Sequence, residues 1–460
     1  MHPDEAASKQ AGTAGGLMSQ ASPTTLVRAI GRWSLTALVV NSIIGSGIFG
    51  LPSVVAGLVG RASPLAYLIA AAGIGIIMAC FAEVASRFRE AGGPYLYARV
   101  AFGRFLGIQI SWLYWLTRLT AAAAGANLFV IYLAEFWPRA KEPLPRVLVL
   151  TLLVGMLAAV NYRGVRAGAQ LSNVFTVAKL LPLLAFIVAG LFDLLSRHGV
   201  TSLPPTEAAG TGAWLQAVLV LVFAYGGFEA ALVPMSEATD PQRDAPFALF
   251  SALLTTTVVY TLIQVVVIGV LANPAATDRP LATAARQFLG PAGAGLIAAG
   301  AMVSVYGYLS ANMLHSPRLT FALAERGDFP KFFAGVHQRF RTPHVSIVIF
   351  AMLLWALAVG GSFRWNLLLS AVARLFTYGV TCAALPALRR KQPGAAAYRL
   401  PAGPVFAFFG VAFSAVLLAR MGRGELVIVS VTAGVALLNW MWVRRRPAPA
   451  QAPPGDHFGR

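Results

Sequence analysis

The first long apolar segment of this chain is interrupted where a membrane-spanning helix would be regular. Residues 39–52 read VVNSIIGSGIFGLP, with three glycines, two serines and a proline. Lipid cannot hydrogen-bond bare peptide groups, so such a break survives only where protein or a polar ligand satisfies them. The sixth apolar segment holds a second break, at Gly226 and Gly227. Two glycine-interrupted spans at matching positions of two halves are typical of the binding site of a transporter.

The composition indicates a membrane protein. Only 12% of the residues are charged, 57% are apolar and the mean hydropathy is +0.69, whereas a soluble domain has about 25% charged residues. A transmembrane helix needs about 20 mostly apolar residues. We therefore expect an all-α integral membrane protein with twelve transmembrane helices, at about residues 34–59, 64–86, 107–132, 145–161, 169–191, 214–236, 247–271, 291–314, 344–360, 365–388, 403–419 and 424–443.

The distribution of cations argues against a nucleic-acid-binding protein, despite a net charge of +19. If the N-terminus lies inside, the inner tails and loops hold 23 of the 36 Lys and Arg residues, and the outer loops hold 10. Such an excess on alternate loops follows the positive-inside rule. We therefore expect a multi-pass protein of the cell membrane with both termini cytoplasmic, whose surroundings are the lipid bilayer and not nucleic acid.

One transmembrane domain is expected, over residues 32–446, between disordered cytoplasmic tails at 1–31 and 447–460. The first tail lacks the apolar core of a signal peptide. Within the domain, two five-span blocks at 34–191 and 214–388 each open with a broken helix, and the opening spans run in opposite directions. This pattern predicts an inverted repeat of five plus five spans. Two extra helices, within residues 403–443, lie outside it.

Helix polarity explains why the two breaks suit an amino acid. A half-helix that begins at a break offers free N–H groups and a positive dipole end, which favours a carboxylate beside the backbone of Ser46 and Gly47. A half-helix that ends at a break offers carbonyl oxygens, which favour an ammonium group. Those carbonyls belong to Ile43, Ile44, Phe223 and Ala224, with Tyr225 at the end of its half-helix. In the alternative interpretation, Gly45, Gly47, Gly226 and Gly227 only allow tight helix packing.

Four ionisable residues lie well inside predicted spans: Arg118, Lys179, Glu229 and Arg374. Each would cost at least about 2.5–3.5 kcal/mol if it faced lipid, so each is expected to face the interior. Three cations then face one acid, because Glu83 and Glu135 lie near span ends. An acidic substrate could balance this excess of positive charge.

The motifs GSGIF at 45–49, GGPY at 92–95 after Glu83, and FE at 228–229 before SE at 236–237 and DP at 240–241 extend the pattern. With these motifs and twelve spans, nearly the whole chain resembles the amino acid–polyamine–organocation superfamily. The resemblance implies a leucine-transporter-type fold and transport of amino acids or amines by alternating access. It also implies that Lys179 replaces a sodium ion, since sodium-independent relatives have a lysine there.

The same resemblance suggests roles for further residues. Arg118 and Arg374 lie on spans that line the substrate cavity in the superfamily, and Arg374 matches an arginine of the cystine/glutamate exchanger. Phe223 occupies the position of an aromatic lid, and Tyr378 that of a gate. The expected substrate-binding residues are Ile43, Ile44, Gly45, Ser46, Gly47, Arg118, Phe223, Ala224, Tyr225, Gly227, Asn312 and Arg374, and the expected coupling or gating residues are Lys179, Glu229 and Tyr378.

Each of these residues has an alternative interpretation. Lys179 could transfer protons, act as a fixed ammonium in an exchanger, or extend to the membrane interface. Both arginines could bond carbonyls at the breaks or pair with Glu229, which could itself hold the break open or relay protons. Asn312 could link helices instead of binding substrate, and Ser370 shares that ambiguity. Phe223 and Tyr378 could be ordinary packing aromatics.

The sequence therefore predicts a sodium-independent secondary active transporter of small neutral or acidic amino acids, working by proton symport or exchange. An amino acid sensor and a transporter of another amine or organic solute are the alternatives. An enzyme is not expected, because the histidines are scattered and no catalytic or metal motif is present. No cofactor is expected. Cys80 and Cys382 lie in apolar spans, so no disulfide framework is expected. Animal light-subunit relatives bind an accessory glycoprotein through a cysteine between spans three and four, and the loop from Trp137 to Arg146 has none, so the resemblance implies no disulfide-linked accessory subunit.

Overall fold

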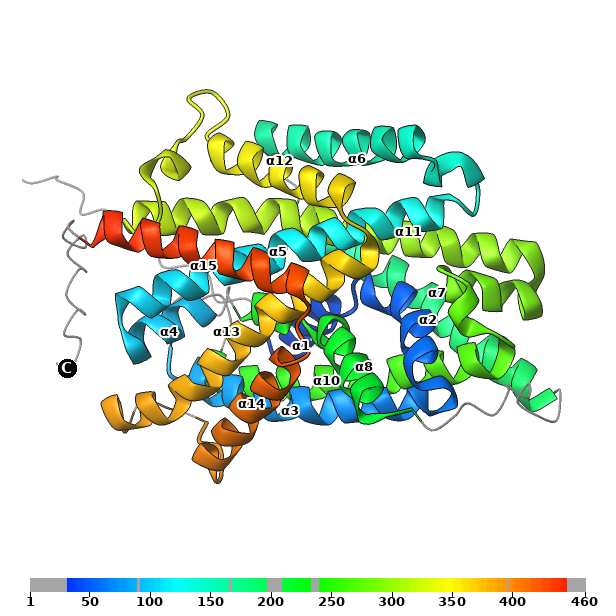
Figure 1. Ribbon diagram of the computed structural model, residues 1–460, viewed down its shortest axis with the longest axis horizontal. Coiled ribbons are helices and arrows are strands. Elements are labelled where there is room, and N and C mark those ends of the chain that lie inside the picture. Colours follow the sequence, from blue (N-terminus) through cyan, green and yellow to red (C-terminus); the bar gives the residue numbers. More distant parts are fainter. Residues whose placement is uncertain are drawn as a thin grey trace, which may run out of the picture.

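The computed structural model describes residues 31–88, 92–164, 168–196, 209–232, 240–394, 396 and 398–444, with side chains of α7 described from Leu180 onward. All regular structure within these residues is helical (Figure 1). The α-helices are α1 (Arg32–Ile43), α2 (Gly47–Val59), α3 (Ser63–Ser86), α4 (Pro94–Phe102), α5 (Arg104–Leu133), α6 (Pro143–Arg163), α7 (Gly168–Ser196), α8 (Thr211–Tyr225), α9 (Phe228–Ala231), α10 (Pro241–Val270), α11 (Pro280–Glu325), α12 (His344–Gly360), α13 (Phe363–Lys391), α14 (Gly403–Leu418) and α15 (Arg423–Val443). Short 3-10 turns are η1 (Gly60–Ala62), η2 (Pro138–Lys141), η4 (Pro274–Ala276) and η5 (Lys331–Ala334).

Eight helical stretches within the described residues are long and apolar enough to cross a membrane. Three shorter apolar helices accompany them, at Leu180–Ser196, His344–Gly360 and Gly403–Leu418. The eight stretches are Gly47–Ser86, Arg104–Leu133, Pro143–Arg163, Thr211–Ala231, Arg243–Val270, Pro280–Glu325, Phe363–Lys391 and Arg423–Val443. Each of the twelve predicted spans overlaps a helix within the described residues, but length and composition alone identify eight candidates and not twelve.

One helix, α11, extends far beyond its predicted span, and another lies where a loop was expected. α11 runs from Pro280 to Glu325, although the sequence indicated a span at only 291–314. Gly290, with φ +68, interrupts the helical backbone near its start. At the other end, Leu323 and Ala324 are buried, so an apolar face continues to be packed after the predicted end. The short helix α4, which follows the GGP sequence, also falls in a predicted loop.

The two broken helices pair crosswise at the centre of the molecule. α1 packs against α9, and α2 packs against α8. Because the first half of each broken helix contacts the second half of the other, the two run antiparallel. The opening spans of the two blocks were predicted to run in opposite directions, and this pairing agrees with that expectation. α3 and α10 flank the broken helices, and α5 packs against α13 and α11 (Figure 1).

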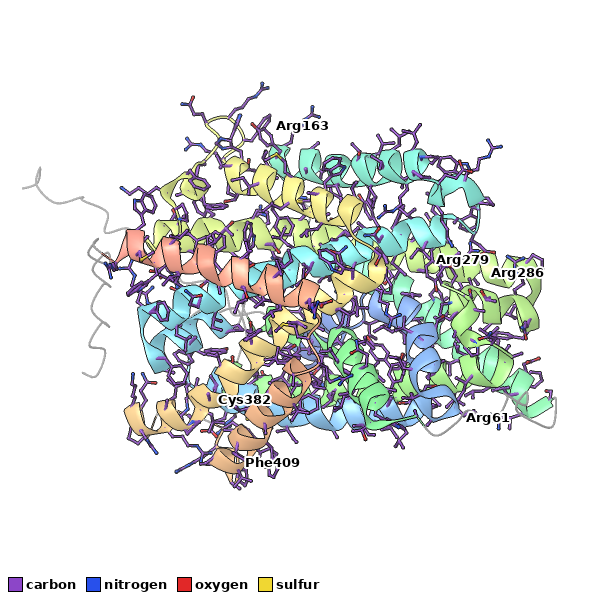
Figure 2. All side chains as sticks on the ribbon, viewed as in Figure 1. Arg61, Arg163, Arg279, Arg286, Cys382 and Phe409 are labelled. Carbon is purple, nitrogen blue, oxygen red and sulfur yellow. The ribbon has the colours of Figure 1, made fainter. Side chains whose placement is uncertain are left out.

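Charged side chains mark the ends of the helix bundle. Arg61, Arg279 and Arg286, from two predicted outer loops, lie toward the same end (Figure 2). The C-terminal end of α15 lies at the opposite end (Figure 1). This arrangement agrees with the predicted alternation of loops.

Two buried carboxylates hold the other end together. Asp328, three residues after the end of α11, accepts hydrogen bonds from Tyr95 Oη at 3.1 Å, Arg104 Nε at 2.8 Å and Arg99. Its backbone carbonyl accepts from Asn439 on α15. These contacts tie α4, α5 and α15 to the end of α11.

The second carboxylate is Glu83 on α3. It accepts from Arg87 at 2.8 Å and from Arg389 on α13 at 2.6 and 2.9 Å. The backbone N–H of Leu400 also donates to it at 2.9 Å. α3, α13 and the segment before α14 are therefore joined through one acid.

A pair of helix breaks as the candidate substrate site

The first break separates α1 from α2. α1 ends at Ile43, three residues from Ile44 to Ser46 are non-helical, and α2 begins at Gly47. Ile44 has φ −72 and ψ 87, which cannot continue an α-helix. Ile43, Ile44, Ser46 and Gly47 are all buried. The structure thus confirms an interrupted helix at the position that the sequence indicated.

The second break separates α8 from α9 and depends on a glycine. α8 ends at Tyr225, and Gly226 and Gly227 connect it to Phe228. Gly227 has φ +112, in the left-handed region that favours glycine. A Cβ atom there would lie 2.3 Å from the carbonyl oxygen of Ser42 on α1. Glycine is therefore required at this position both by backbone conformation and by close approach to the first broken helix.

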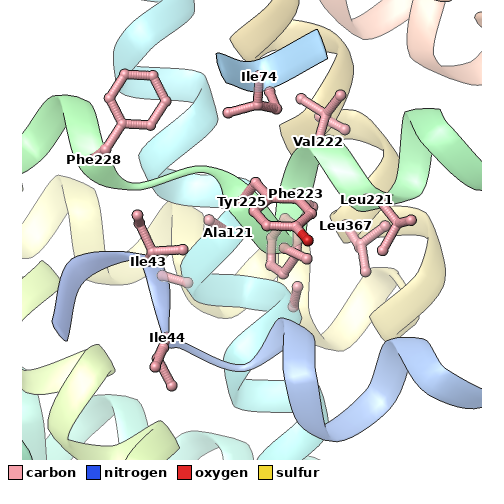
Figure 3. Close-up of a cluster of buried hydrophobic side chains, with 14 of the residues drawn as sticks. Ile43, Ile44, Ile74, Ala121, Leu221, Val222, Phe223, Tyr225, Phe228 and Leu367 are labelled. Carbon is pink, nitrogen blue, oxygen red and sulfur yellow. The ribbon is translucent and has the colours of Figure 1, made fainter. Parts of the chain in front are cut away.

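The two breaks face each other in the interior (Figure 3). A Cβ atom on Gly47 would lie 3.1 Å from Ala224 Cα and 3.4 Å from the ring of Phe223. The N-terminal end of α2 is therefore next to the C-terminal end of α8, and the Phe223 ring covers it. A positive and a negative helix end stand side by side, which is the charge pattern of a zwitterion.

Arg374 of α13 reaches the second break. Its Nη1 atom lies 3.3 Å from Glu229 Oε1, and both side chains are at least 95% buried. A Cβ atom on Gly226 would lie 1.5 Å from this Nη1, so the guanidinium occupies the space that a side chain would need. Within the described residues, Nε and Nη1 of Arg374 have no hydrogen-bond partner. The structure therefore agrees with the alternative in which Arg374 pairs with Glu229. The Nε donor of the guanidinium remains outside this pair.

Glu229 also holds the backbone of the break. Its Oε2 atom accepts from the N–H of Gly227 at 2.9 Å and from Tyr378 Oη at 3.0 Å. Tyr378 lies on α13, one turn after Arg374, and its ring packs on Phe228 and Phe81. Of the two roles considered for Glu229, these contacts support the one that holds the break open.

Arg118 and Asn312 meet in a separate group between α5 and α11. Arg118 Nε donates to Ser316 Oγ at 3.3 Å, and Asn312 Nδ2 donates to the carbonyl oxygen of Arg118 at 3.0 Å. Ser370 donates to the carbonyl oxygen of Thr117 at 3.1 Å. These contacts link helices, as the alternative interpretation of Asn312 and Ser370 expects.

Glu83 and Glu135, the acids near the ends of predicted spans, are paired with arginines away from the two breaks. Glu83 pairs with Arg87 and Arg389, as described above. Glu135 pairs with Arg279 at 3.1 Å and with Arg286. Neither acid is paired with Arg118 or Arg374, so the charge excess at the centre is relieved by Glu229 alone among the described acids.

Two tyrosines at the breaks were not expected from the sequence. Tyr260 of α10 is fully buried, and its hydroxyl lies 3.1 Å from Ile43 O and 3.2 Å from Ala224 O. Tyr308 of α11 lies against Gly45, because a Cβ atom there would be 3.7 Å from its ring. A tyrosine in an apolar span gives little signal in sequence, since aromatic packing is the common fate of such residues.

A cavity of about 400 Å³ lies away from the breaks, beside the end of α12. Arg146 there donates to the carbonyl oxygens of Ala358, Val359 and Gly361. The arginine thereby satisfies the free carbonyls at a helix C-terminus. None of the break residues lines this cavity. It lies beside a helix end that Arg146 caps, and it is not part of the candidate site.

Comparison with known proteins gives the family. The family model "Amino acid permease" matches residues 30–435. The chain belongs to the amino acid permease family. It is 28% identical to the methylthioribose transporter of Bacillus subtilis, over 85% of this chain and 87% of that protein. It is 29% identical to the serine/threonine exchanger of the same organism, over 70% and 74%, and 28% identical to a protein assigned there as an arginine/ornithine antiporter, over 69% and 74%.

Family membership establishes a multi-pass membrane permease and not an enzyme. The relatives are transporters and exchangers of amino acids or related solutes, so this permease carries a small molecule of that general type. The substrates after which these relatives are named differ widely in charge and shape. Family membership therefore does not identify the substrate of this permease, which has to be inferred from the residues at its breaks.

One expected coupling residue falls partly outside what the structure describes, and two histidines lie closer together than expected. Lys179 lies on α7 of the permease, but its side chain is outside the described residues. His337 and His344, expected to be scattered, lie together with ring centroids 5.6 Å apart and pack on Tyr162. Among the described residues, no three His, Cys, Asp or Glu side chains are grouped to hold a metal ion.

Proposed function

We propose that this permease is a sodium-independent secondary active transporter of small neutral or acidic amino acids. The observation that supports this most strongly is the pairing of two opposite helix ends at the breaks. The substrate carboxylate would bind at the start of α2, at the backbone of Ser46 and Gly47 under the Phe223 ring. The ammonium group would bind the carbonyls at the ends of α1 and α8, from Ile43 to Ile44 and from Phe223 to Tyr225.

The helix packing supports the proposed five-plus-five inverted repeat. In this repeat α1–α2, α3, α5, α6 and α7 correspond to α8–α9, α10, α11, α12 and α13. The contacts follow the correspondence: α1 packs on α10 as α8 packs on α3, and α5 packs on α13 as α11 packs on α7. Likewise, α3 contacts α13 as α10 contacts α7. We therefore propose twelve spans of the leucine-transporter type, with α14 and α15 outside the repeat.

Alternating access follows from this architecture. The residues 44–46 and 226–227 are short non-helical links, which can absorb changes in backbone angles when the half-helices tilt. Moving α1 and α9 away from the bundle would open the site to one side. Moving α2 and α8 would open it to the other side.

The charges at the site favour neutral and acidic substrates. Arg374 presents a guanidinium at the second break, and its Nε atom, which has no hydrogen-bond partner among the described residues, could donate to a substrate carboxylate. A lysine or arginine side chain would meet repulsion from Arg374 and Arg118. The serine/threonine exchanger supports a small neutral substrate, whereas the arginine/ornithine antiporter shows that family members need not share this preference.

The driving force is proposed to come from proton symport or from exchange. Lys179, at the position where sodium-coupled relatives bind the ion, is the proposed coupling residue. Glu229 and Tyr378 are proposed to gate the second break through their mutual hydrogen bond. Both termini are proposed to be cytoplasmic, and no disulfide-linked subunit is expected. Because one relative is a methylthioribose transporter, a solute that is not an amino acid is the second candidate substrate.

A competition panel on purified protein in proteoliposomes tests the proposal. All twenty amino acids, polyamines and methylthioribose would compete for uptake, with and without sodium and with and without a pH gradient. We expect inhibition by small neutral or acidic amino acids, no sodium requirement, and loss of the pH-gradient response in Lys179→Ala if protons drive transport. Inhibition by methylthioribose alone, or binding without uptake, would contradict the proposed function.

A further inference from the structure

Tyr260 makes a contact with the breaks that the proposed function does not use. Its hydroxyl lies within hydrogen-bond distance of Ile43 O, at the end of α1, and of Ala224 O, near the end of α8. These carbonyls come from two different broken helices. Both belong to the set proposed above to bind the ammonium group of the substrate.

The two carbonyls share one donor hydrogen. A tyrosine hydroxyl has a single O–H, so it satisfies one of them fully or both in part. An ammonium group has three N–H donors and could satisfy both carbonyls at once without the tyrosine hydroxyl. Two carbonyl oxygens therefore share one O–H donor, and the primary ammonium group of a substrate would supply the second donor.

Neighbouring rings fix the position of this hydroxyl. The ring of Tyr260 packs on Tyr225 of α8, with centroids 5.4 Å apart, and on Tyr67 of α3, at 6.2 Å. Tyr225 donates its own hydroxyl to the carbonyl oxygen of Tyr67, within the same cluster. Tyr260 is fully buried, so no water-exposed rotamer competes with this placement.

We propose that the Tyr260 hydroxyl occupies the ammonium subsite of the empty carrier and gives up its carbonyls to the substrate. This inference rests on the proposed function, because it assumes an amino acid at the breaks. A buried carbonyl without a donor is costly. An empty carrier that caps Ile43 O and Ala224 O internally avoids this cost and can close without substrate. The permease therefore performs net transport and is not an obligatory exchanger.

Tyr260→Phe removes the hydroxyl and keeps the ring. Without the competing hydroxyl the ammonium group binds more tightly, and without the cap the empty carrier closes more slowly. We expect the KM for net uptake to fall by about fivefold and the maximal rate of net uptake to fall by about 5- to 30-fold. Exchange, in which the carrier returns loaded, keeps its maximal rate.

Tyr132→Phe is the matched control. Tyr132 is also fully buried, and its hydroxyl donates to the carbonyl oxygen of Phe49 at 2.7 Å, in the first turn of α2 and not to a carbonyl of the ammonium subsite. It loses a buried hydrogen bond of the same type. We expect its KM to stay unchanged and any loss of rate to affect net uptake and exchange equally.

The experiment measures uptake of radiolabelled L-serine and L-glutamate into proteoliposomes that are empty or loaded with the unlabelled amino acid. A lower KM with selective loss of net uptake in Tyr260→Phe supports the inference. Equal loss of net uptake and exchange, or no change, overturns it. If neither amino acid enters with wild-type protein, the proposed function fails and not the role of Tyr260.

A second measurement does not depend on whether the variant folds. Wild-type proteoliposomes loaded with labelled L-serine are diluted into medium without amino acid. Efflux into this medium supports internal capping, because the carrier must return empty. Efflux only after external L-serine is added overturns the inference, since it shows that the empty carrier cannot return.

Discussion

Gly227 is the residue on which the geometry of the second break depends most. Its φ of +112 and the 2.3 Å between a Cβ atom there and Ser42 O leave no room for another residue. A non-glycine residue in this region costs about 1–3 kcal/mol before any clash is counted. The clash is with backbone of the other broken helix, which cannot move aside without shifting α1.

Gly227→Ala is therefore expected to lower the melting temperature of the purified permease and to abolish uptake. Gly155→Ala is the control, since Gly155 lies within α6 with open space around a Cβ atom. It is expected to be neutral or slightly stabilising, because alanine favours helix by about 1 kcal/mol over glycine. Equal stability and uptake in the two variants would refute the close approach of the breaks.

Arg374 and Glu229 form a buried pair whose members depend on each other. Arg374→Gln leaves a carboxylate unpaired in the interior, which costs about 3–5 kcal/mol. The double variant Arg374→Gln with Glu229→Gln removes both charges, so most of the stability is expected to return. Thermal unfolding of the two single variants and the double variant gives the coupling energy.

The same variants show whether Arg374 contributes only to stability or also to the recognition of acidic substrates. If Arg374 binds an acidic side chain, the stable double variant still loses inhibition by L-glutamate while it keeps inhibition by L-serine. Full additivity of the stability changes would contradict the pairing. Unaltered inhibition by L-glutamate would remove Arg374 from acidic recognition.

At the scale of single residues, the sequence shows which residues are unusual for a membrane span, but it does not show which residues they contact. Glycine clusters inside apolar spans, and charges among them, stand out because lipid makes both costly. The breaks at 44–46 and 226–227 were therefore predictable. Tyr260 was not, since its two carbonyl partners lie 217 and 36 positions away in the chain. The pairing of Arg374 with Glu229 was only one of several alternatives for the same reason.

At the scale of elements, buried ion pairs join helices that are distant in sequence. Asp328 has a fully buried side chain, and its partners Arg99 and Arg104 are about one-fifth exposed. It connects the end of α11 with α4 and the start of α5. The apolar pattern of the sequence does not specify such links, although it places α3, α5, α10 and α13 close to their observed bounds.

Asp328→Asn should loosen this end of the bundle. Two arginines lose their acid, and we expect destabilisation of about 1–3 kcal/mol, seen as a lower melting temperature and faster proteolysis near α4. Asp278→Asn is the control, because the pair of Asp278 with Lys141 is about half exposed. Exposed pairs contribute about 0–1 kcal/mol. Equal effects of the two variants would contradict the structural role of Asp328.

At the scale of the whole molecule, the distribution of charge predicts the orientation in the membrane. Arg61 and Arg279 lie toward one end of the bundle, opposite the C-terminal end of α15 (Figures 1 and 2). The positive-inside rule places the end with fewer cations outside. The alternation of loops was visible in the sequence because it is a property of composition. Helix packing across the proposed repeat was not visible, because it depends on side-chain contacts between distant segments.

Single cysteines test this orientation. Arg61→Cys and Arg279→Cys should react with a membrane-impermeant maleimide added to intact cells, and Arg326→Cys should react only after permeabilisation. The native Cys80 and Cys382 are buried, so the wild-type protein gives the background. Labelling of Arg326→Cys from outside, with Arg61→Cys protected, would reverse the proposed orientation.

The most direct test of the account is whether both charged ends of the substrate are needed. Uptake of the best-transported amino acid of the panel would be inhibited by that amino acid, by its N-acetyl derivative and by its methyl ester. Each derivative loses the charge recognised by one helix end, so we expect inhibition weaker by about 10- to 100-fold for both. Inhibition by either derivative as strong as that by the free amino acid would contradict a site built from the two breaks.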